Sequence, residues 1–165
     1  MRGRQRDTAR EGGTMIEKVL IPTDDSDTAR KAIDFAARLL ESTSCQVTLL
    51  AVVEEPVYSA FWSDGLIAPE VILPPQEELR AELENRARAV LEESASPLHA
   101  RGLEVRTRIR FGNSAAEILR EAEEGGYEMI VMGGHGRGVL GGFTLGSVSN
   151  RVVHHAKCPV LIVRS

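Results

Sequence analysis

The chain has 165 residues, of which 42% are hydrophobic and 27% are charged, and its formal net charge is −4 at pH 7. This length suits one ordinary domain with a sizeable core. Two cysteines are too few for a disulfide framework, so we expect a cytoplasmic protein. The acidic balance argues against non-specific binding to nucleic acid, and no apolar run approaches the roughly 20 residues that a membrane span requires.

Residues 1–14 carry four arginines, three glycines and no large apolar residue after Met1. A segment without large apolar side chains has little to bury, so we expect a disordered N-terminal arm before a single domain over residues 15–165. The arm also lacks the apolar stretch of a secretory signal peptide. Met15 lies just before the first predicted strand and would itself make a sensible N-terminus.

The first part of the domain is predicted to form a strand, a helix and a second strand. Residues 18–22 are short and apolar, and Ser26 can cap a helix that extends to about Glu41, with apolar residues recurring on one face. Residues 46–53 are almost wholly apolar and rich in β-branched side chains. Such a run is typical of a parallel strand that is covered on both faces.

Residues 54–75 show no regular period and contain four of the seven prolines. Three of the seven aromatic residues, Tyr58, Phe61 and Trp62, also lie here. A loop of this length inside a compact domain is usually functional or mobile. It is either a lid or partner-docking patch, or a satellite hydrophobic cluster that fixes the loop to the body of the domain.

A long charged helix and an edge strand follow this loop. The helix runs from Gln76 to about His99 with apolar residues on one side, and Pro97 is expected to kink or end it. Residues 103–111 alternate between apolar and polar side chains. This alternation predicts a strand with one exposed face, at the edge of a sheet.

Two more strand and helix pairs complete the pattern. Ser114 and Glu117 have the spacing of a capping box, which predicts the start of a helix that ends at Gly125. Residues 129–132 are predicted to form a buried strand. We expect a last helix that continues to about His155 and a fifth strand over residues 159–163. The alternation of strands and helices predicts a parallel sheet with helices on both faces.

The segment from Met132 to Asn150 contains seven glycines and joins the fourth predicted strand to a helix that begins near Ser147. Glycine lets the backbone approach an anion closely, and a helix N-terminus supplies free N–H groups, so this segment is expected to bind phosphate. The P-loop pattern is absent because the segment has no lysine. A GxGxxG pattern is present, but no helix opens there and no acidic residue lies downstream of Glu128 to bind a ribose.

A different glycine spacing is complete, namely Gly133-x2-Gly136-x9-Gly146-Ser147. It resembles the G-x2-G-x9-G-[ST] nucleotide-binding motif of the universal stress protein family, in its ATP-binding branch. The resemblance covers essentially all of residues 15–165, including the opening run VLIPTDDSDTA and the closing run HAKCPVLIV. The alternative is a flexible surface loop with incidental glycines, which would not explain why the matching glycines lie between a strand and a helix.

The resemblance implies an α/β fold built on a single open, doubly wound, five-stranded parallel sheet with strand order 3-2-1-4-5. That order places the switch point between the first and fourth strands, where ligands bind beyond the carboxyl ends of the strands. The glycine loop should therefore face Asp24 across one crevice. The resemblance also implies a homodimer through antiparallel pairing of Val160–Val163, an apolar edge that would otherwise be exposed.

The resemblance further implies an adenine nucleotide as the ligand: ATP, ADP or AMP. The backbone of Val52 would meet the adenine edge, and Asp24 would help to hold the adenosine, although it is a plain turn aspartate in the simpler interpretation. Gly133 and Gly136 would allow close approach of the ribose and phosphate. A Mg²⁺ ion would be held through the phosphate oxygens rather than by a protein cage.

The terminal phosphates would lie at the start of the last helix, where Gly146 and Ser147 offer backbone N–H groups and a hydroxyl. His135 either flanks the phosphates or is a neutral exposed histidine, and Ser149 is a further contact candidate. The predicted nucleotide-binding residues are Pro22, Thr23, Asp24, Val52, Met132, Gly133, His135, Gly136, Gly146, Ser147, Val148 and Ser149.

The leading functional interpretation is a cytoplasmic, nucleotide-responsive regulator of the stress response, with unknown protein partners. One alternative is a slow ATPase, which needs a group that activates water, and only His135 and Asp24 are candidates. Another is a protein-interaction module with an empty crevice, against which the intact glycine motif argues. His154, His155 and Cys158 do not predict a metal site, because adjacent helix residues point to different faces.

Overall fold

The computed structural model of the chain describes residues 16–54, 76–136 and 145–164. The predicted N-terminal arm, the aromatic loop and the middle of the glycine segment therefore lie outside the described residues. The elements, in chain order, are β1 (Lys18–Pro22), α1 (Asp27–Leu39), β2 (Gln46–Val53), α2 (Gln76–His99), β3 (Glu104–Phe111), α3 (Ser114–Glu124), β4 (Met129–Gly133), α4 (Ser147–His155) and β5 (Val160–Val163).

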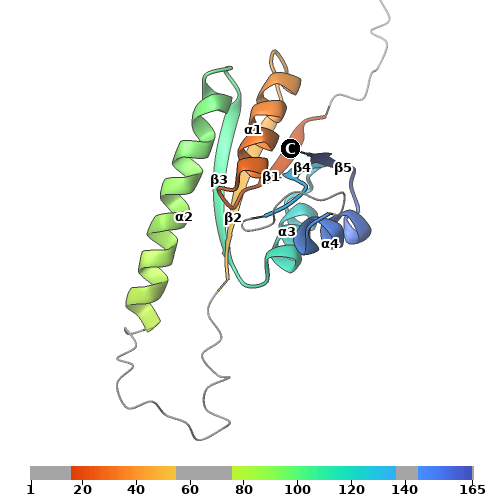
Figure 1. Ribbon diagram of the computed structural model, residues 1–165. Coiled ribbons are helices and arrows are strands. Elements are labelled where there is room, and N and C mark those ends of the chain that lie inside the picture. Colours follow the sequence, from red (N-terminus) through yellow and green to blue (C-terminus); the bar gives the residue numbers. More distant parts are fainter. Residues whose placement is uncertain (1–15, 55–75, 137–144, 165) are drawn as a thin grey trace, which may run out of the picture.

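The five strands form one sheet in the order β3-β2-β1-β4-β5, and every neighbouring pair is parallel. Helices α1 and α2 cover one face of the sheet, and α3 and α4 cover the other (Figure 1). The predicted fold class and strand order are confirmed, and so is the edge position of β3. The order reverses between β1 and β4, so this is where the carboxyl ends of the strands leave room for a ligand.

The core consists of two layers because successive side chains of a strand point to opposite faces of the sheet. In β1, Val19 and Ile21 pack beneath α1 and α2, whereas Leu20 packs beneath α3 and α4. The same alternation in β4 sends Val131 to the first layer and Met132 to the second. All five side chains are buried, which explains why the sequences of β1 and β4 contain continuous apolar runs.

The starts of the helices follow the predicted chemistry, with one correction. Ser26 caps α1 as expected, since its hydroxyl oxygen accepts a hydrogen bond from Ala29 N at 3.2 Å. The predicted capping box on α3 is wrong, because Asn113 is the N-cap and Ser114 is the first helical residue. Helix α4 begins at Ser147, as predicted, and Gly146 is its N-cap.

Pro97 was expected to kink or end α2, and the helix instead ends two residues later, at His99. A proline removes only one backbone donor, and near the end of a helix this loss affects only the last turn. Leu98 is fully buried in the layer beneath α1 and α2, so tertiary packing holds this turn in place.

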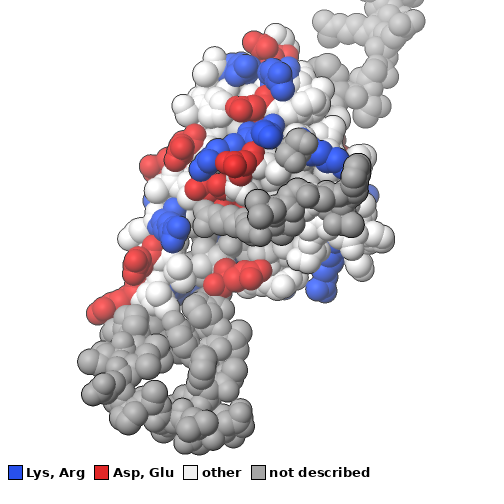
Figure 2. Space-filling view, in the orientation of Figure 1, with Lys and Arg blue, Asp and Glu red and all other residues white. Residues whose placement is uncertain are grey.

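Acidic and basic side chains are interspersed over the face that Figure 2 displays, without a continuous area of one sign among the described residues. Within residues 16–54, 76–136 and 145–164, no helix combines the length and apolarity that crossing a bilayer requires.

Candidate functional site

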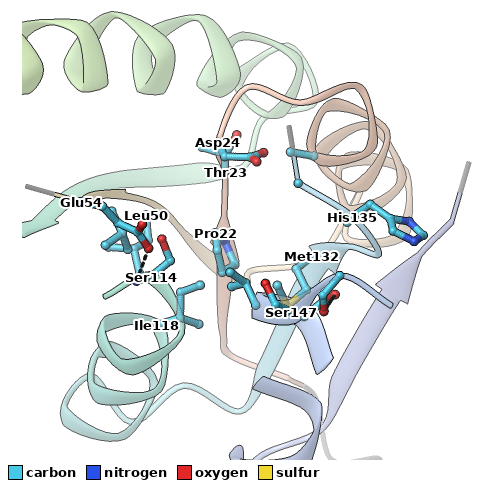
Figure 3. Close-up of a pocket in the computed structure, with 17 residues that line it drawn as sticks. Pro22, Thr23, Asp24, Leu50, Glu54, Ser114, Ile118, Met132, His135 and Ser147 are labelled. Carbon is cyan, nitrogen blue, oxygen red and sulfur yellow. Dashed lines mark hydrogen bonds between the residues drawn. The ribbon is translucent and has the colours of Figure 1, made fainter. Parts of the chain in front are cut away.

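A pocket of about 310 Å³ lies at the carboxyl ends of β1, β2 and β4, where the strand order reverses (Figure 3). Its volume is at the lower end of the range for small-molecule sites. The structure brings all twelve residues of the predicted nucleotide site to this pocket. Five further residues line it that the sequence did not indicate: Ala29, Leu50, Glu54, Ser114 and Ile118.

The end of β1 supplies one wall of the pocket. Strand β1 stops at Pro22, and the Thr23 N–H donates a last hydrogen bond to the Leu50 carbonyl at 2.9 Å. The chain then turns, and Asp24 Oδ1 accepts a hydrogen bond from Ser26 N at 3.1 Å. This short-range bond fixes the Asp24 carboxylate at the mouth of the pocket, in the manner of an aspartate turn.

The backbone of Val52 is directed towards the pocket by the geometry of β2. Residues of a parallel strand direct their N–H and C=O groups alternately to the two neighbouring strands. The Leu50 carbonyl accepts from Thr23 on the β1 side, and the Val53 carbonyl accepts from Gly112 at 3.0 Å on the β3 side. Val52 therefore presents both its donor and its acceptor on the β1 side, past the last residue of that strand.

Hydrogen bonds join the two described ends of the glycine segment. The Gly146 N–H donates to the Gly134 carbonyl at 2.8 Å, and the Ser149 hydroxyl donates to the same carbonyl at 2.7 Å. On the other side, the Thr28 hydroxyl donates to the His135 carbonyl. Ser149 is buried, so its hydroxyl fixes the loop to α4, and this contact accounts for its presence at the pocket.

The N-termini of three helices border the pocket, and they differ in how their first N–H groups are satisfied. Helix α1 is capped by Ser26, and α3 is capped by Asn113, whose Oδ1 accepts from Ala116 N at 3.2 Å. Helix α4 has Gly146 at the N-cap, and no side chain of the described residues caps it with a hydrogen bond. Its first turn therefore offers backbone donors and the positive end of the helix dipole at the pocket.

Glu54 lies just beyond β2 and contacts the start of α3. Its Oε1 accepts a hydrogen bond from the Ser114 N–H at 3.0 Å (Figure 3). The backbone N–H of Ser114, together with the Ser114 hydroxyl, lowers the pKa of Glu54 below its ordinary value. The side chain is therefore an ionised acceptor at neutral pH, on the opposite side of the pocket from Ser147 (Figure 3).

His135 reaches the pocket mainly through its backbone. Its imidazole projects away from Asp24 and Pro22 in Figure 3. Its Nε2 is buried and has no hydrogen-bond partner among the described residues. The expectation that the ring flanks phosphate groups stays a prediction.

The residues that the sequence analysis missed follow a simple pattern. Leu50 and Glu54 lie two positions before and two positions after Val52, so the period of a strand places all three side chains on one face. Extending the predicted site by this period would have found both. Ser114 and Ile118 lie one turn apart on α3, and only the packing of that helix against β2 brings them to the pocket.

The cysteines and the paired histidines lie in ordinary structural surroundings. Cys45 is buried and Cys158 is half-buried, and burial raises the pKa of both thiols. His154 Nδ1 lies 2.8 Å from the Asn150 carbonyl oxygen, within its own helix. Among the described residues, no three His, Cys, Asp or Glu side chains are grouped so that they could hold a metal ion.

Comparison with known proteins gives one consistent result. The family model described as the universal stress protein family matches residues 15–164. The universal stress protein YxiE of Bacillus subtilis is 34% identical over 151 residues, which cover 91% of this chain and 100% of that protein.

Two solved structures place the fold among known ones. The structure of the hypothetical protein MJ0577 has a TM-score of 0.76 and 30% sequence identity, and the match covers 92% of this chain and 97% of that one. MJ0577 is a universal stress protein of Methanocaldococcus jannaschii. A universal stress protein from Archaeoglobus fulgidus in complex with dAMP has a TM-score of 0.62 and 20% identity, over 90% of this chain and 98% of that one. At that identity the likeness concerns the fold.

Proposed function

This chain belongs to the universal stress protein family, and we propose that it binds an adenine nucleotide in the pocket at the switch point of the sheet. The observation that carries the proposal is the N-terminus of α4, which borders the pocket and has glycine at its N-cap, with no capping side chain among residues 16–54, 76–136 and 145–164. An anion is the natural partner of such a helix start, because it accepts from the free N–H groups and lies at the positive end of the dipole. The dAMP complex with the same fold supports the choice of ligand.

The base would lie at the other end of the pocket, against the apolar side chains of Leu50, Ile118 and Met132. Val52 presents one backbone donor and one backbone acceptor there. Adenine carries a ring-nitrogen acceptor next to an amino donor, which matches this pair. A flat apolar base with one polar edge therefore suits the wall better than a sugar or an amino acid.

The ribose and phosphates would extend from the base towards α4. Asp24 would accept from ribose hydroxyls, because an ionised carboxylate only accepts hydrogen bonds. The phosphates would contact the N–H groups of Ser147 and Val148, and the Ser147 hydroxyl. With ATP, a Mg²⁺ ion would be held by the phosphate oxygens.

We infer that the protein acts as a nucleotide-responsive regulator in the cytoplasm, as a homodimer that pairs through Val160–Val163. Strand β5 lies at the edge of the sheet, and its four apolar side chains are all partly exposed, which supports a pairing surface. The match of the family model begins at residue 15, which supports a domain over residues 15–165 and a separate arm over residues 1–14.

Calorimetric titration with ATP, ADP and AMP in the presence of Mg²⁺ tests the proposal. Gly146→Val should weaken ATP binding at least about tenfold, because a branched side chain would occupy the space in which phosphate approaches the backbone. Ser147→Ala should cost about 1–2 kcal/mol, since one hydroxyl contact is lost and the backbone donors remain. Hydrolysis measured as phosphate release should stay below about 1 s⁻¹, the low end of ordinary enzyme rates.

Gly146→Ala is the matched control for folding. Apart from its chain neighbours, the nearest atoms of the described residues would lie 3.4 Å from a Cβ at this position, and the φ of −63° suits any residue. Equal ATP affinity in the wild type and in Gly146→Val would contradict the placement of the phosphates. Rapid turnover would instead favour the enzyme interpretation.

A further inference from the structure

The pocket contains an ionised carboxylate that the proposed contacts do not use. Glu54 lines the pocket together with Leu50 and Val52, which precede it at intervals of two residues along β2. Alternation along the strand places these three side chains on the face that α3 covers. The carboxylate thus extends the wall against which the base would lie, just past the backbone edge of Val52.

The start of α3 holds the carboxylate in place. Oε1 accepts from the Ser114 N–H at 3.0 Å, which satisfies a free donor of the first turn of α3, and the Ser114 hydroxyl also interacts with the carboxylate. A carboxylate has about four acceptor sites on its two oxygens, so these contacts with Ser114 leave its second oxygen with capacity to accept. Because the group is ionised, it has no hydrogen to donate. A ligand atom that meets this second oxygen must therefore be a donor.

We propose that the second carboxylate oxygen of Glu54 accepts a hydrogen bond from the 6-amino group of the bound purine and makes the site select 6-amino purines over 6-oxo purines. The inference rests on the proposed nucleotide binding at this pocket. An amino group at this position carries two hydrogens, one for the Val52 carbonyl and one for Glu54. The two acceptors are separated by one residue along β2, so a single amino group can serve both.

A 6-oxo purine reverses this chemistry. Its carbonyl oxygen would face the Val52 carbonyl and the Glu54 carboxylate, so two acceptors would oppose a third with no proton between them. Leaving polar groups unpaired in a site built for a hydrogen bond gives strong discrimination, because the desolvation cost is not recovered. We expect the wild-type protein to prefer ATP over inosine triphosphate by about 100-fold or more.

Glu54 also accepts the first N–H of α3, so the test must separate base recognition from helix stability. Glu54→Gln retains a side-chain oxygen for the Ser114 N–H, but it can turn an amide NH₂ towards the base. The preference for ATP over inosine triphosphate should therefore fall at least about tenfold, through weaker binding of ATP and tighter binding of inosine triphosphate. Calorimetric titration of each triphosphate with Mg²⁺ into each protein measures the four affinities.

Asn113→Ala is the matched control. It removes the hydrogen bond between Asn113 Oδ1 and Ala116 N, which loosens the same helix end without changing Glu54. This variant should lower the melting temperature and leave the ratio of the two affinities unchanged. A parallel change of the ratio in Asn113→Ala and Glu54→Gln would assign the effect to the helix and overturn the inference.

The remaining outcomes distinguish the inference from the function on which it rests. If the wild type binds both triphosphates equally well, or if Glu54→Gln keeps the wild-type ratio, Glu54 does not select the base and nucleotide binding stands. If the wild type binds neither triphosphate, the proposed function itself fails. If the preference for ATP over inosine triphosphate falls in Glu54→Gln and not in Asn113→Ala, base selection is assigned to this carboxylate.

Discussion

Gly133 and Gly146 belong to one sequence motif, but their surroundings in the structure differ. A Cβ on Gly133 would lie 2.8 Å from both the carbonyl carbon and the hydroxyl oxygen of Thr28. A Cβ on Gly146 would meet the nearest atoms of the described residues, apart from its chain neighbours, at 3.4 Å. The first glycine is therefore required for β4 to pass close to the start of α1. Contacts with the described residues do not require the second, which is consistent with a requirement imposed by a ligand.

Gly133→Ala should destabilise the protein by about 1–3 kcal/mol, because the methyl group would overlap the backbone of α1, which cannot move as a flexible side chain does. Urea denaturation followed by circular dichroism measures the change in the free energy of unfolding. The matched variant Gly146→Ala should change it by less than about 0.5 kcal/mol. Equal losses in the two variants would show that the close approach at Gly133 is not a packing requirement.

At the scale of elements, α3 illustrates what the sequence could and could not predict. Asn113 and Ser114 are both good N-cap residues, so the local pattern leaves an ambiguity of one residue. Asn113 is the cap, and Glu54, which is 60 positions away in the chain, accepts the Ser114 N–H. The helix was therefore predictable from its own residues, whereas the contact of its first N–H with Glu54 is tertiary and was not.

The same distinction holds for the sheet and the pocket. The strands were predictable because their apolar periods are strong, as in residues 46–53. The strand order was available only through the family resemblance, since the handedness of crossovers leaves several orders possible. Asp24 and the glycines were predictable from their motif, while Ser114 and Ile118 reach the pocket only through packing of α3.

One arginine joins β3 to α3 through three glutamates. Arg110 contacts Glu121 Oε2 at 2.6 Å and Glu117 Oε2 at 3.5 Å, and it also pairs with Glu124. The side chains of Glu117 and Glu121 are only 9% and 7% exposed. Burial lowers the pKa of the Arg110 guanidinium, but the hydrogen bonds of Glu124 and Glu121 outweigh it and raise the pKa above its ordinary value. The guanidinium is therefore the cation that pairs with the buried Glu121 carboxylate, whereas Glu117 also pairs with Arg120, at 2.8 Å.

Arg110→Met should destabilise the protein by about 3 kcal/mol, because it leaves the buried Glu121 carboxylate without its cation. Thermal unfolding at neutral pH measures the loss. Arg106→Met is the control on the same strand, since Arg106 pairs with Glu104 in an exposed position and should contribute less than about 1 kcal/mol. Similar losses in the two variants would contradict the role given to the buried cluster.

At the scale of the whole molecule, the free edge of β5 determines how two copies can meet. The Pro159 carbonyl accepts from Ile130 N on β4 at 3.0 Å, and the Val163 carbonyl accepts from Gly134 N, just past β4, at 2.9 Å. Backbone direction alternates along a strand, so Leu161 also faces β4, and Ile162 faces outward. The outward backbone groups are those that a second copy would pair with.

Ile162→Pro should convert the proposed dimer to a monomer, because it removes an outward donor and leaves the hydrogen bonds to β4 intact. Light scattering measures the mass, and circular dichroism checks the fold. Leu161→Pro should instead disrupt the pairing of β5 with β4 and lower the melting temperature more. A wild-type protein that is monomeric at micromolar concentration would contradict pairing through this strand.

The central claim, that an adenine nucleotide lies between Val52 and the start of α4, is tested most directly by following backbone amide signals in ¹H–¹⁵N NMR spectra during titration with ATP and Mg²⁺. The signals of Val52, Ser147 and Val148 should shift together with one dissociation constant, whereas that of Arg106 on the distant β3 should stay in place. Unchanged signals at both ends of the pocket, at ATP concentrations on the order of 1 mM, would contradict the claim.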